Sequence, residues 1–307
     1  METIVPKILI FGKNGQVAYE LQKLLPSLGT VVALSSAECN LYDKAAIYHG
    51  LETCRPNIIV NAAAYTAVDK AESEQDKAFA LNADAPAYIA SWAKKHNTIL
   101  VHYSTDYIFD GTKHTPITEE DTPNPLNIYG ASKLKGDINI QASGCSYLIF
   151  RTTWVYGARG KNFYLTMRKL LPEREKLTVV DDQHGAPTHC ADIAWATAAA
   201  LKYTLNCGLH DTAKQLSAIY NLTNSGETTW FGFAAAIKDQ MLKKDPTIKL
   251  ADILPVKTSE YKTPAVRPHY SVLDNTKIAM TFGIYTNDWL TALQDVCRKS
   301  QRIAGRY

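Results

Sequence analysis

The stretch KILIFGKNGQVAYEL (Lys7–Leu21) decides the fold. Its first part, Lys7–Gly12, is a short apolar run that predicts a buried strand, and a helical pattern follows near Gln16–Leu25. Gly12 and Gly15 lie between the two, where glycine permits a tight turn and a close approach to the backbone. The free N–H groups at the start of the helix would then face a pyrophosphate. Strand, glycine loop and helix in this order predict the start of a dinucleotide-binding domain.

Further apolar runs follow along the first half of the chain. Residues 30–34, 58–64, 98–105 and 146–157 are interpreted as strands, and helical patterns lie at 78–95 and around YGASKLKGD (129–137). Strands that are hydrophobic throughout and separated by helices are typical of a parallel sheet covered on both faces. The predicted fold class is therefore α/β, a doubly wound parallel sheet (Rossmann) with a smaller C-terminal substrate-binding region.

The pattern changes after Gly157. Residues 1–153 are predicted to form the dinucleotide-binding Rossmann domain, and residues 188–225, with a helix in ADIAWATAAALKYT (191–204) and a last strand, to return to it. Residues 154–187 and 226–307 are predicted to form the substrate-binding region. We expect the tail from Glu227 to be rich in loops, apart from a helix in TWFGFAAAIKDQM (229–241), and to cover the mouth of the sheet.

Composition limits the partners and the compartment. The chain has 307 residues, 46% of them hydrophobic and 21% charged, with a formal net charge of +3. This charge is too small to indicate a nucleic acid or an anionic membrane as partner, and no apolar run approaches the roughly 18 residues that span a bilayer. The six cysteines are scattered, without the spacing of a zinc site. We therefore expect a soluble, cytoplasmic protein with reduced thiols.

The end of the second predicted strand bears on the choice of cofactor. NAD-dependent enzymes of this fold carry an acidic residue there, which holds the ribose 2′-hydroxyl. Here ALSSAECN places Ser35 and Ser36 at that position, and Lys13 in the glycine loop could attract a 2′-phosphate. NADPH is therefore favoured over NADH, although Glu38 is close enough to keep NADH possible.

Two further segments bring hydroxyl, phenol and ammonium groups to one place. HYSTDYIFDG (102–111) follows the fourth strand, so that Ser104 and Thr105 emerge at the carboxyl edge of the sheet, where ligands of α/β proteins bind. PLNIYGASKLKGD (125–137) places Tyr129 and Lys133 four residues apart, on one face of a helix. A glycine loop, a hydroxyl residue at a strand end and this Tyr–Lys pair occur together far less often by chance than any one of them, and together they indicate a dehydrogenase-type site.

This set of groups suits the reduction of a ketone, which needs a hydride on carbon and a proton on oxygen. The Lys133 ammonium and an oxidised nicotinamide would both favour the phenolate of Tyr129, and so bring the pKa of this phenol from about 10 toward working pH. Tyr129 would donate the proton, Lys133 would also hold the nicotinamide ribose, and Thr105 would donate a hydrogen bond to the carbonyl oxygen.

The segments quoted above, together with RPNIIVNAAAYTAVDKAE (55–72), FRTTWVYG (150–157), DDQHGAPT (181–188) and TPAVRPHYSVLD (263–274), resemble the extended short-chain dehydrogenase/reductase family. Within it they resemble the branch that reduces 4-keto sugar nucleotides. The resemblance implies reduction of dTDP-4-dehydro-β-L-rhamnose to dTDP-L-rhamnose, a precursor of cell-surface polysaccharide, with NADPH as the cofactor.

The resemblance also implies a set of site residues. Those expected at the pyrophosphate, the adenine and the rest of the cofactor groove are Gly15, Gln16, Val17, Asn40, Leu41, Ala64, Tyr65, Thr66 and Tyr103, beside Gly12, Lys13 and Ser35. Those expected at the sugar nucleotide are Thr105, Asp106 and Trp154, with Thr105, Tyr129 and Lys133 catalytic. Trp154 suits stacking on a sugar face or packing in the core. Arg267 is placed with the substrate-binding residues, where it would bind phosphates or only pin its loop.

The sequence departs from the family pattern in places that bear on metal and assembly. Ala18 takes the position of the third loop glycine, which the fold tolerates. Some members bind magnesium between subunits through acidic side chains. Glu20 falls at one such position, but Ala191 replaces another, so that no metal is predicted and both a monomer and a homodimer stay open. His102 and His184 are interpreted as structural histidines.

Two alternatives stay open from the sequence. Another sugar-nucleotide member, a 4,6-dehydratase or an epimerase, is one; a dehydratase typically needs an acidic dyad, and here Asp106 is followed by Tyr107, which favours simple reduction. A regulatory NADP-binding subunit, such as the β-subunit of methionine adenosyltransferase, is the other. The complete set of Thr105, Tyr129 and Lys133 favours catalysis, and consumption of NADPH with a 4-keto sugar nucleotide would distinguish the two.

Overall fold

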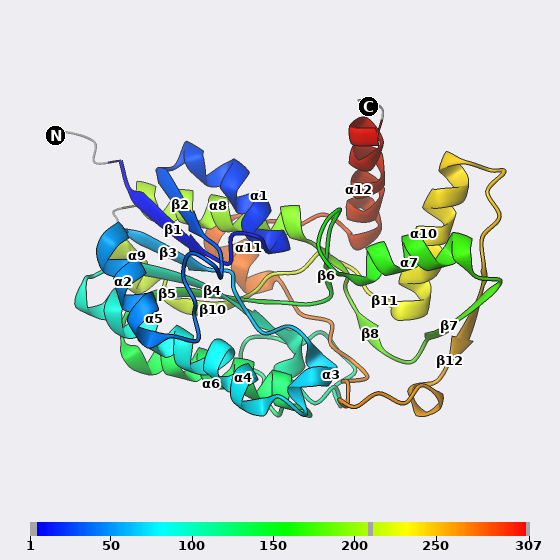
Figure 1. The fold of residues 1–307 in the computed structure, drawn as a ribbon, viewed down its shortest axis with the longest axis horizontal. Helices are drawn as coiled ribbons and strands as arrows, with labels where there is room; N and C mark the ends of the chain where they lie inside the picture. The colour runs from blue at the N-terminus through cyan, green and yellow to red at the C-terminus, as the bar shows by residue number, and fades with distance from the viewer. Residues whose placement is uncertain (1–4, 208–210, 305–307) are drawn as a thin grey trace.

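The computed structural model describes residues 5–207 and 211–304 of this chain. Its centre is a six-stranded sheet in the order β10-β5-β4-β3-β1-β2, and every neighbouring pair is parallel (Figure 1). The strands are β1 (Lys7–Phe11), β2 (Thr30–Leu34), β3 (Ile58–Asn61), β4 (Ile99–Thr105), β5 (Ser146–Thr152) and β10 (Ala218–Asn221). The predicted doubly wound parallel sheet is confirmed.

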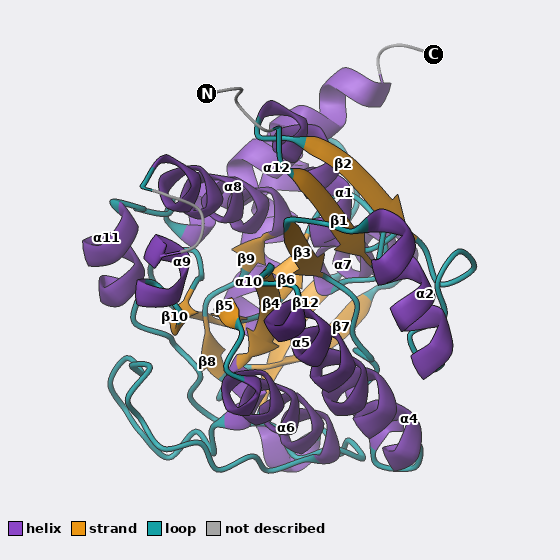
Figure 2. Cartoon of the chain, turned by 90° about the vertical axis from the view of Figure 1, so that its left-hand side faces the viewer, coloured by secondary structure: helices purple, strands orange, loops and turns teal. Residues whose placement is uncertain are grey.

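Helices cover both faces of the sheet, as Figure 2 shows. One face packs against α1 (Gln16–Leu24), α8 (Cys190–Asn206), α9 (Asp211–Gln215) and α11 (Thr276–Phe282). The other packs against α2 (Lys44–Cys54), α5 (Ala85–Lys95) and α6 (Ile128–Ser143). Because both faces are buried, strand residues such as Ile8, Leu9 and Ile10 are all fully enclosed, and this explains the continuous apolar runs.

A second hydrophobic cluster lies beyond the carboxyl edge of the sheet. It is formed by α7 (Phe163–Glu173), α10 (Trp230–Lys244), α12 (Trp289–Ala304) and a parallel pair of strands, β7 (Lys176–Val180) and β12 (Asp252–Val256). Figure 1 shows these elements together on the right of the sheet. Two small strand pairs join this part to the rest: β6 (Val155–Tyr156) with β9 (Thr188–His189), and β8 (His184–Gly185) with β11 (Thr228–Thr229).

The structure differs from the predicted elements at three places. The run 146–157 is not one strand, because β5 ends at Thr152 and Trp154 has a left-handed φ of 45°, which turns the chain out of the sheet. The predicted helix 78–95 is divided into α4 (Gln75–Phe79), a π-helical turn η2 (Ala80–Asp84) and α5. The tail is not mainly loops, since it contains α10, α11 and α12.

The remaining short elements are α3 (Val68–Ala71) and the 3-10 turns η1 (Leu25–Ser27), η3 (Asp106–Ile108) and η4 (Thr258–Glu260). Among the described residues, no helix combines the length and the apolar character needed to cross a membrane.

Candidate active site

A cleft of about 530 Å³ opens at the carboxyl edge of the sheet. It lies at the ends of β1 and β3, where the chain order of the strands reverses and where ligands of doubly wound proteins bind. Its size is that of a small-molecule site. The predicted residues that line it are Gly12, Gly15, Gln16, Val17, Ser35, Asn40, Leu41, Ala64, Thr66, Tyr103, Tyr129 and Lys133. Lys13, Tyr65, Thr105, Asp106, Trp154 and Arg267 are not in its lining.

The glycine turn at one end of the cleft is shaped for an anion. Gly12 has φ +87°, and a Cβ there would lie 2.8 Å from the backbone nitrogen of Ala63, so that only glycine fits. Gly15 is the N-cap of α1, without a side-chain cap and without an acidic residue in the first turn. The first N–H groups of α1 and the positive end of its dipole therefore stay available to a pyrophosphate, and this end of the cleft fits a dinucleotide.

The end of β2 carries a balanced pair of charges rather than a positive one. Glu38 accepts a hydrogen bond from the backbone N–H of Ser35 at 2.8 Å, and the Lys13 Nζ lies 3.2 Å from its carboxylate. The backbone and side chain of Ser35, and then Lys13, lower the pKa of Glu38 to about 2. A charged carboxylate therefore lies beside Ser35, and Lys13 is engaged with it. This arrangement weakens the argument that Lys13 is free for a 2′-phosphate.

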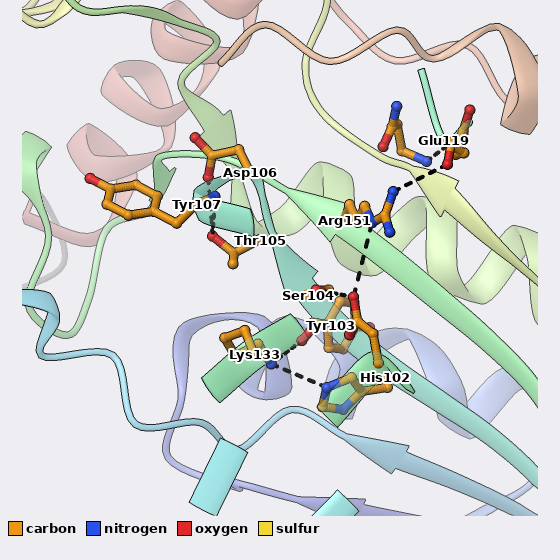
Figure 3. Close-up of polar contacts among 11 residues, drawn as sticks. His102, Tyr103, Ser104, Thr105, Asp106, Tyr107, Glu119, Lys133 and Arg151 are labelled. Atoms are coloured by element: carbon orange, nitrogen blue, oxygen red, sulfur yellow. Dashed lines mark hydrogen bonds and ion pairs between the residues drawn. The ribbon is translucent and has the colours of Figure 1, made fainter. Parts of the chain in front are cut away.

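The predicted catalytic groups lie where β4 ends and α6 begins, and Figure 3 shows two of them, Thr105 and Lys133. The Thr105 side chain lies beside the Tyr129 phenol and lowers its pKa, and the Thr105 hydroxyl accepts from the Tyr107 backbone N–H at 3.2 Å. Lys133, only 2% exposed, donates to the backbone oxygen of Tyr103 at 2.5 Å. Four residues along one helix separate Tyr129 from Lys133, so that α6 brings both to the cleft.

The surroundings of Tyr129 bear on its expected titration. Burial raises the pKa of this phenol to about 12, and Thr105 only partly opposes that effect. Burial therefore acts against the expected effect of Lys133 and an oxidised nicotinamide on the phenol, which stays a prediction. Burial also lowers the pKa of Lys133 to about 8, against the opposing effect of the Asp137 carboxylate. At neutral pH Tyr129 thus keeps the proton that a general acid must donate.

The first turn of α6 is fixed from several sides. Asn127 caps it by accepting from the Gly130 N–H at 2.8 Å, and its own side-chain N–H donates to the Val266 backbone oxygen at 2.7 Å. A Cβ on Gly130 would lie 2.1 Å from the Tyr107 backbone oxygen, so that α6 packs directly on η3. These contacts hold Tyr129 at the edge of the sheet.

Asn82 is a site residue that the sequence does not predict. Its amide accepts from the Tyr65 N–H at 2.8 Å and donates to the Ser132 hydroxyl at 3.0 Å. It thereby joins the Tyr65–Thr66 segment at the cleft to α6. Asn82 lies in the π-helical turn η2, a feature that is frequent at functional sites but has no hydrophobic signature.

Asp106 lies behind Thr105 rather than in the cleft. It is 1% exposed, and its two carboxylate oxygens accept from the hydroxyls of Thr105 at 3.1 Å and Thr153 at 2.9 Å. Burial raises the pKa of Asp106 to about 6, and hydrogen bonds with Ser271, Thr153 and Thr105 oppose the shift. In this arrangement Asp106 orients the Thr105 hydroxyl.

The other two predicted substrate residues are already in contact with protein groups. The Trp154 ring stacks on that of Trp230, with 3.7 Å between centroids and 13° between planes. The Arg267 guanidinium donates to both carboxylate oxygens of Asp69, at 3.1 and 2.9 Å, and shares a side-chain hydrogen bond with Tyr107. The contacts of Arg267 favour the alternative in which it pins its loop. Trp230 extends the aromatic surface at this end, and the sequence does not single it out.

No group of three or more His, Cys, Asp or Glu side chains within the described residues could hold a metal ion. Glu20, at the position where some family members bind magnesium, forms an ion pair with Lys23 at 2.8 Å.

Comparisons with known proteins give one family, and each match extends over nearly the whole chain. Residues 6–302 match the profile of a family described as RmlD substrate binding domain. The dTDP-4-dehydrorhamnose reductase of Burkholderia thailandensis is 44% identical over 289 residues, which cover 94% of this chain and 96% of that protein. The protein of the same name from Salmonella typhimurium is 42% identical over 286 residues, which cover 92% and 94%.

The fold of this chain is also similar to solved structures of the same enzyme. The dTDP-4-dehydrorhamnose reductase of Bacillus anthracis, solved in complex with NADP, has a TM-score of 0.85 and 32% identity. The match covers 96% of this chain and 100% of that one.

Proposed function

The chain belongs to the RmlD substrate binding domain family, and from this membership we propose that it reduces the 4-keto group of dTDP-4-dehydro-β-L-rhamnose to give dTDP-L-rhamnose. NADPH is the cofactor, and NADH is possible. The observation that carries the proposal is that Tyr129 and Lys133 line the same cleft as the uncapped start of α1, with Thr105 next to Tyr129. The product is a sugar nucleotide of the kind consumed in polysaccharide synthesis.

Each catalytic residue has a separate task. Bound NADPH supplies the hydride that reduces the ketone carbon. Tyr129 donates its phenolic proton to the ketone oxygen. Thr105, whose hydroxyl donates to Asp106 in the structure, would turn its hydroxyl proton to the ketone oxygen and stabilise the charge that develops there. Lys133, when charged, stabilises the phenolate that this transfer leaves on Tyr129. The N–H groups of Gln16 and Val17, at the start of α1, bind the pyrophosphate.

The chain divides into two parts with different tasks in this proposal. Residues 1–153 and 188–225 bind the cofactor, which is consistent with β10 in the main sheet and α8 packed on α1. Residues 154–187 and 226–307 bind the sugar nucleotide, which is consistent with the separate hydrophobic cluster of α7, α10 and α12. Within the second range, α11 instead packs on the main sheet. Trp154 and Trp230 provide an aromatic surface for the sugar, and Arg267 holds the loop beside it.

The same reasoning gives the setting of the enzyme. Cys39, Cys54, Cys145, Cys190 and Cys297 are free thiols, which is consistent with the reducing cytoplasm. We place the enzyme there, as a monomer or a homodimer, with a nucleotide sugar as its partner and without a nucleic acid or a membrane.

The proposal is tested with the purified protein, NADPH and dTDP-4-dehydro-β-L-rhamnose. We expect the absorbance of NADPH to fall in step with the appearance of dTDP-L-rhamnose. A dehydratase or an epimerase would change the sugar without net consumption of NADPH. A regulatory subunit would bind NADPH without consuming it, and either result would overturn the proposed reduction.

The ion pair at the end of β2 gives a prediction on cofactor choice. Glu38→Gln should raise the ratio of kcat/KM for NADPH to that for NADH, because it removes a negative charge beside Ser35 and frees Lys13 for the 2′-phosphate. We expect a change of up to about tenfold, and a smaller one at high salt, since both side chains are exposed.

Ser35→Asp is the matched variant, for which we expect the ratio of kcat/KM for NADPH to that for NADH to change in the opposite direction. It adds a carboxylate at the same place, and should shift the preference toward NADH. If the ratio of kcat/KM for NADPH to that for NADH is unchanged in both variants, the 2′ position of the ribose does not lie at this end of the cleft.

A further inference from the structure

His102 lies behind the catalytic lysine and has no part in the mechanism described so far. It is the fourth residue of β4 and is 1% exposed. Its Nε2 lies 3.1 Å from the Lys133 Nζ, and its Nδ1 lies 3.2 Å from the side-chain nitrogen of Asn61 (Figure 3 shows the contact with Lys133). Both ring nitrogens therefore face the nitrogen of another side chain.

The ring can satisfy both contacts in only one way. Burial lowers the pKa of His102 well below its usual value, so the ring is neutral and has one donor and one acceptor nitrogen. The Asn61 Oδ1 accepts from the Ala63 backbone N–H at 3.3 Å, and so the amide of Asn61 turns its Nδ2–H groups to the ring. Nδ1 must therefore accept, and the single proton of the ring lies on Nε2.

This tautomer restricts what Lys133 can be. An ammonium group has only donors and cannot accept a hydrogen bond from Nε2–H. An uncharged amine has one lone pair, with which it accepts from His102, while one of its N–H groups donates to the Tyr103 backbone oxygen. The contacts around Lys133 are thus complete when the lysine is neutral and incomplete when it is charged.

We propose that His102 is a positioning residue for Lys133: Asn61 fixes its tautomer, and its Nε2–H stabilises the uncharged amine of this lysine relative to the ammonium. The other groups around Lys133 act in different directions. Asp137, one turn along α6, favours the ammonium, and its carboxylate is itself shared with the Ser104 hydroxyl at 2.6 Å and with Arg151 of β5 at 3.9 Å. The phenol of Tyr129 is one turn away on the other side and is neutral.

Burial, opposed by Asp137, places the titration of Lys133 within the working range, and the proposed bond from His102 acts in the same direction as burial. Burial lowers the pKa of Lys133 to about 8 rather than leaving it at 10.5. The proposed reduction needs the charged lysine, which stabilises the phenolate left on Tyr129. Hence kcat should fall as the pH rises through about 8, and a change that removes Nε2–H should move this fall to higher pH.

The tautomer is measured first, on the unaltered protein, with a readout that does not depend on activity. Long-range ¹H–¹⁵N spectra of protein labelled in histidine distinguish a protonated ring nitrogen from an unprotonated one, and the spectrum of His102→Asn assigns the signals. We expect a proton on Nε2 of His102 and none on Nδ1. In Asn61→Asp, a carboxylate at Nδ1 should move the proton to Nδ1. A proton on Nδ1 in the unaltered protein would overturn the proposal.

The second measurement rests on the proposed reduction and compares profiles of kcat against pH. His102→Asn keeps a polar group near Asn61 but removes the contact with Lys133, and should move the fall in kcat up by about one pH unit. Asn61→Asp should move it in the same direction. A fall that stays in place, or that moves to lower pH, contradicts the proposal. If the chain consumes no NADPH, the proposed function fails, while the spectra still decide the tautomer.

Discussion

Tyr129→Phe is expected to lower kcat by at least about 100-fold, the contribution typical of a general acid, while the dissociation constant for NADPH stays nearly unchanged. The variant removes only the hydroxyl that lies beside the Thr105 side chain, and the ring keeps its edge contact with Tyr107, 5.6 Å away between centroids. The rate that remains is the rate of hydride transfer when no proton donor is held at the ketone oxygen. Steady-state kinetics and a direct titration of NADPH binding separate the two effects.

Tyr107→Phe is the matched control. It removes a phenolic hydroxyl from the neighbouring ring, one that is bonded to Arg267 and is not the proposed proton donor. We expect its kcat to stay within a few-fold of that of the unaltered enzyme. A Tyr129→Phe enzyme that turns over at a near-normal rate would remove Tyr129 from the mechanism. Equal losses in both variants would point to a general effect of the aromatic pair.

Gly130→Ala is expected to be the most damaging of the small substitutions in α6. The added methyl group would lie 2.1 Å from the Tyr107 backbone oxygen, and backbone on both sides must move to admit it. We expect the free energy of unfolding, measured with urea, to fall by about 3 kcal/mol, as overpacking of this severity does elsewhere. Because Gly130 adjoins Tyr129, kcat should fall as well.

Gly50→Ala provides the contrast. Gly50 also lies inside a helix, α2, but a Cβ there would be no nearer than 3.5 Å to the Cys39 sulfur and a Leu34 methyl group. Relief of the low helix propensity of glycine should then stabilise the protein by up to about 1 kcal/mol. A neutral Gly130→Ala would show that the contact between α6 and η3 is looser than the structure indicates.

The sheet could be predicted because its strands are apolar throughout. Residues 30–34 form β2 with the predicted limits, and β1 differs from its predicted span only at Gly12. The break after Thr152 could not be predicted, since Trp154 continues an apolar run and its positive φ has no signature in hydrophobicity. The helices of the tail were underestimated because prolines at 255, 264 and 268 lie between α10 and α11, where they indicate loops.

The meeting of the catalytic groups could also be predicted, because it depends on local rules. Helical spacing brings Tyr129 and Lys133 together, and Thr105 follows from its place at a strand end. The groups that support them could not be found in this way. Asn82 meets Ser132, and Asn61 meets His102, across 50 and 41 residues of chain. Such partners depend on tertiary packing and on hydrogen-bond geometry, which a single sequence does not show.

The contact between Asn127 and Val266 has a consequence for the order in which the enzyme is made. The two residues are separated by 139 positions. A chain still growing on the ribosome contains Thr105, Tyr129 and Lys133 long before residue 266 has been added. Until then, the N-terminal turn of α6 lacks one of the bonds that hold it at the sheet. The nascent chain therefore carries every proposed catalytic group before it can form this anchor of α6, which has to wait until residue 266 has been added.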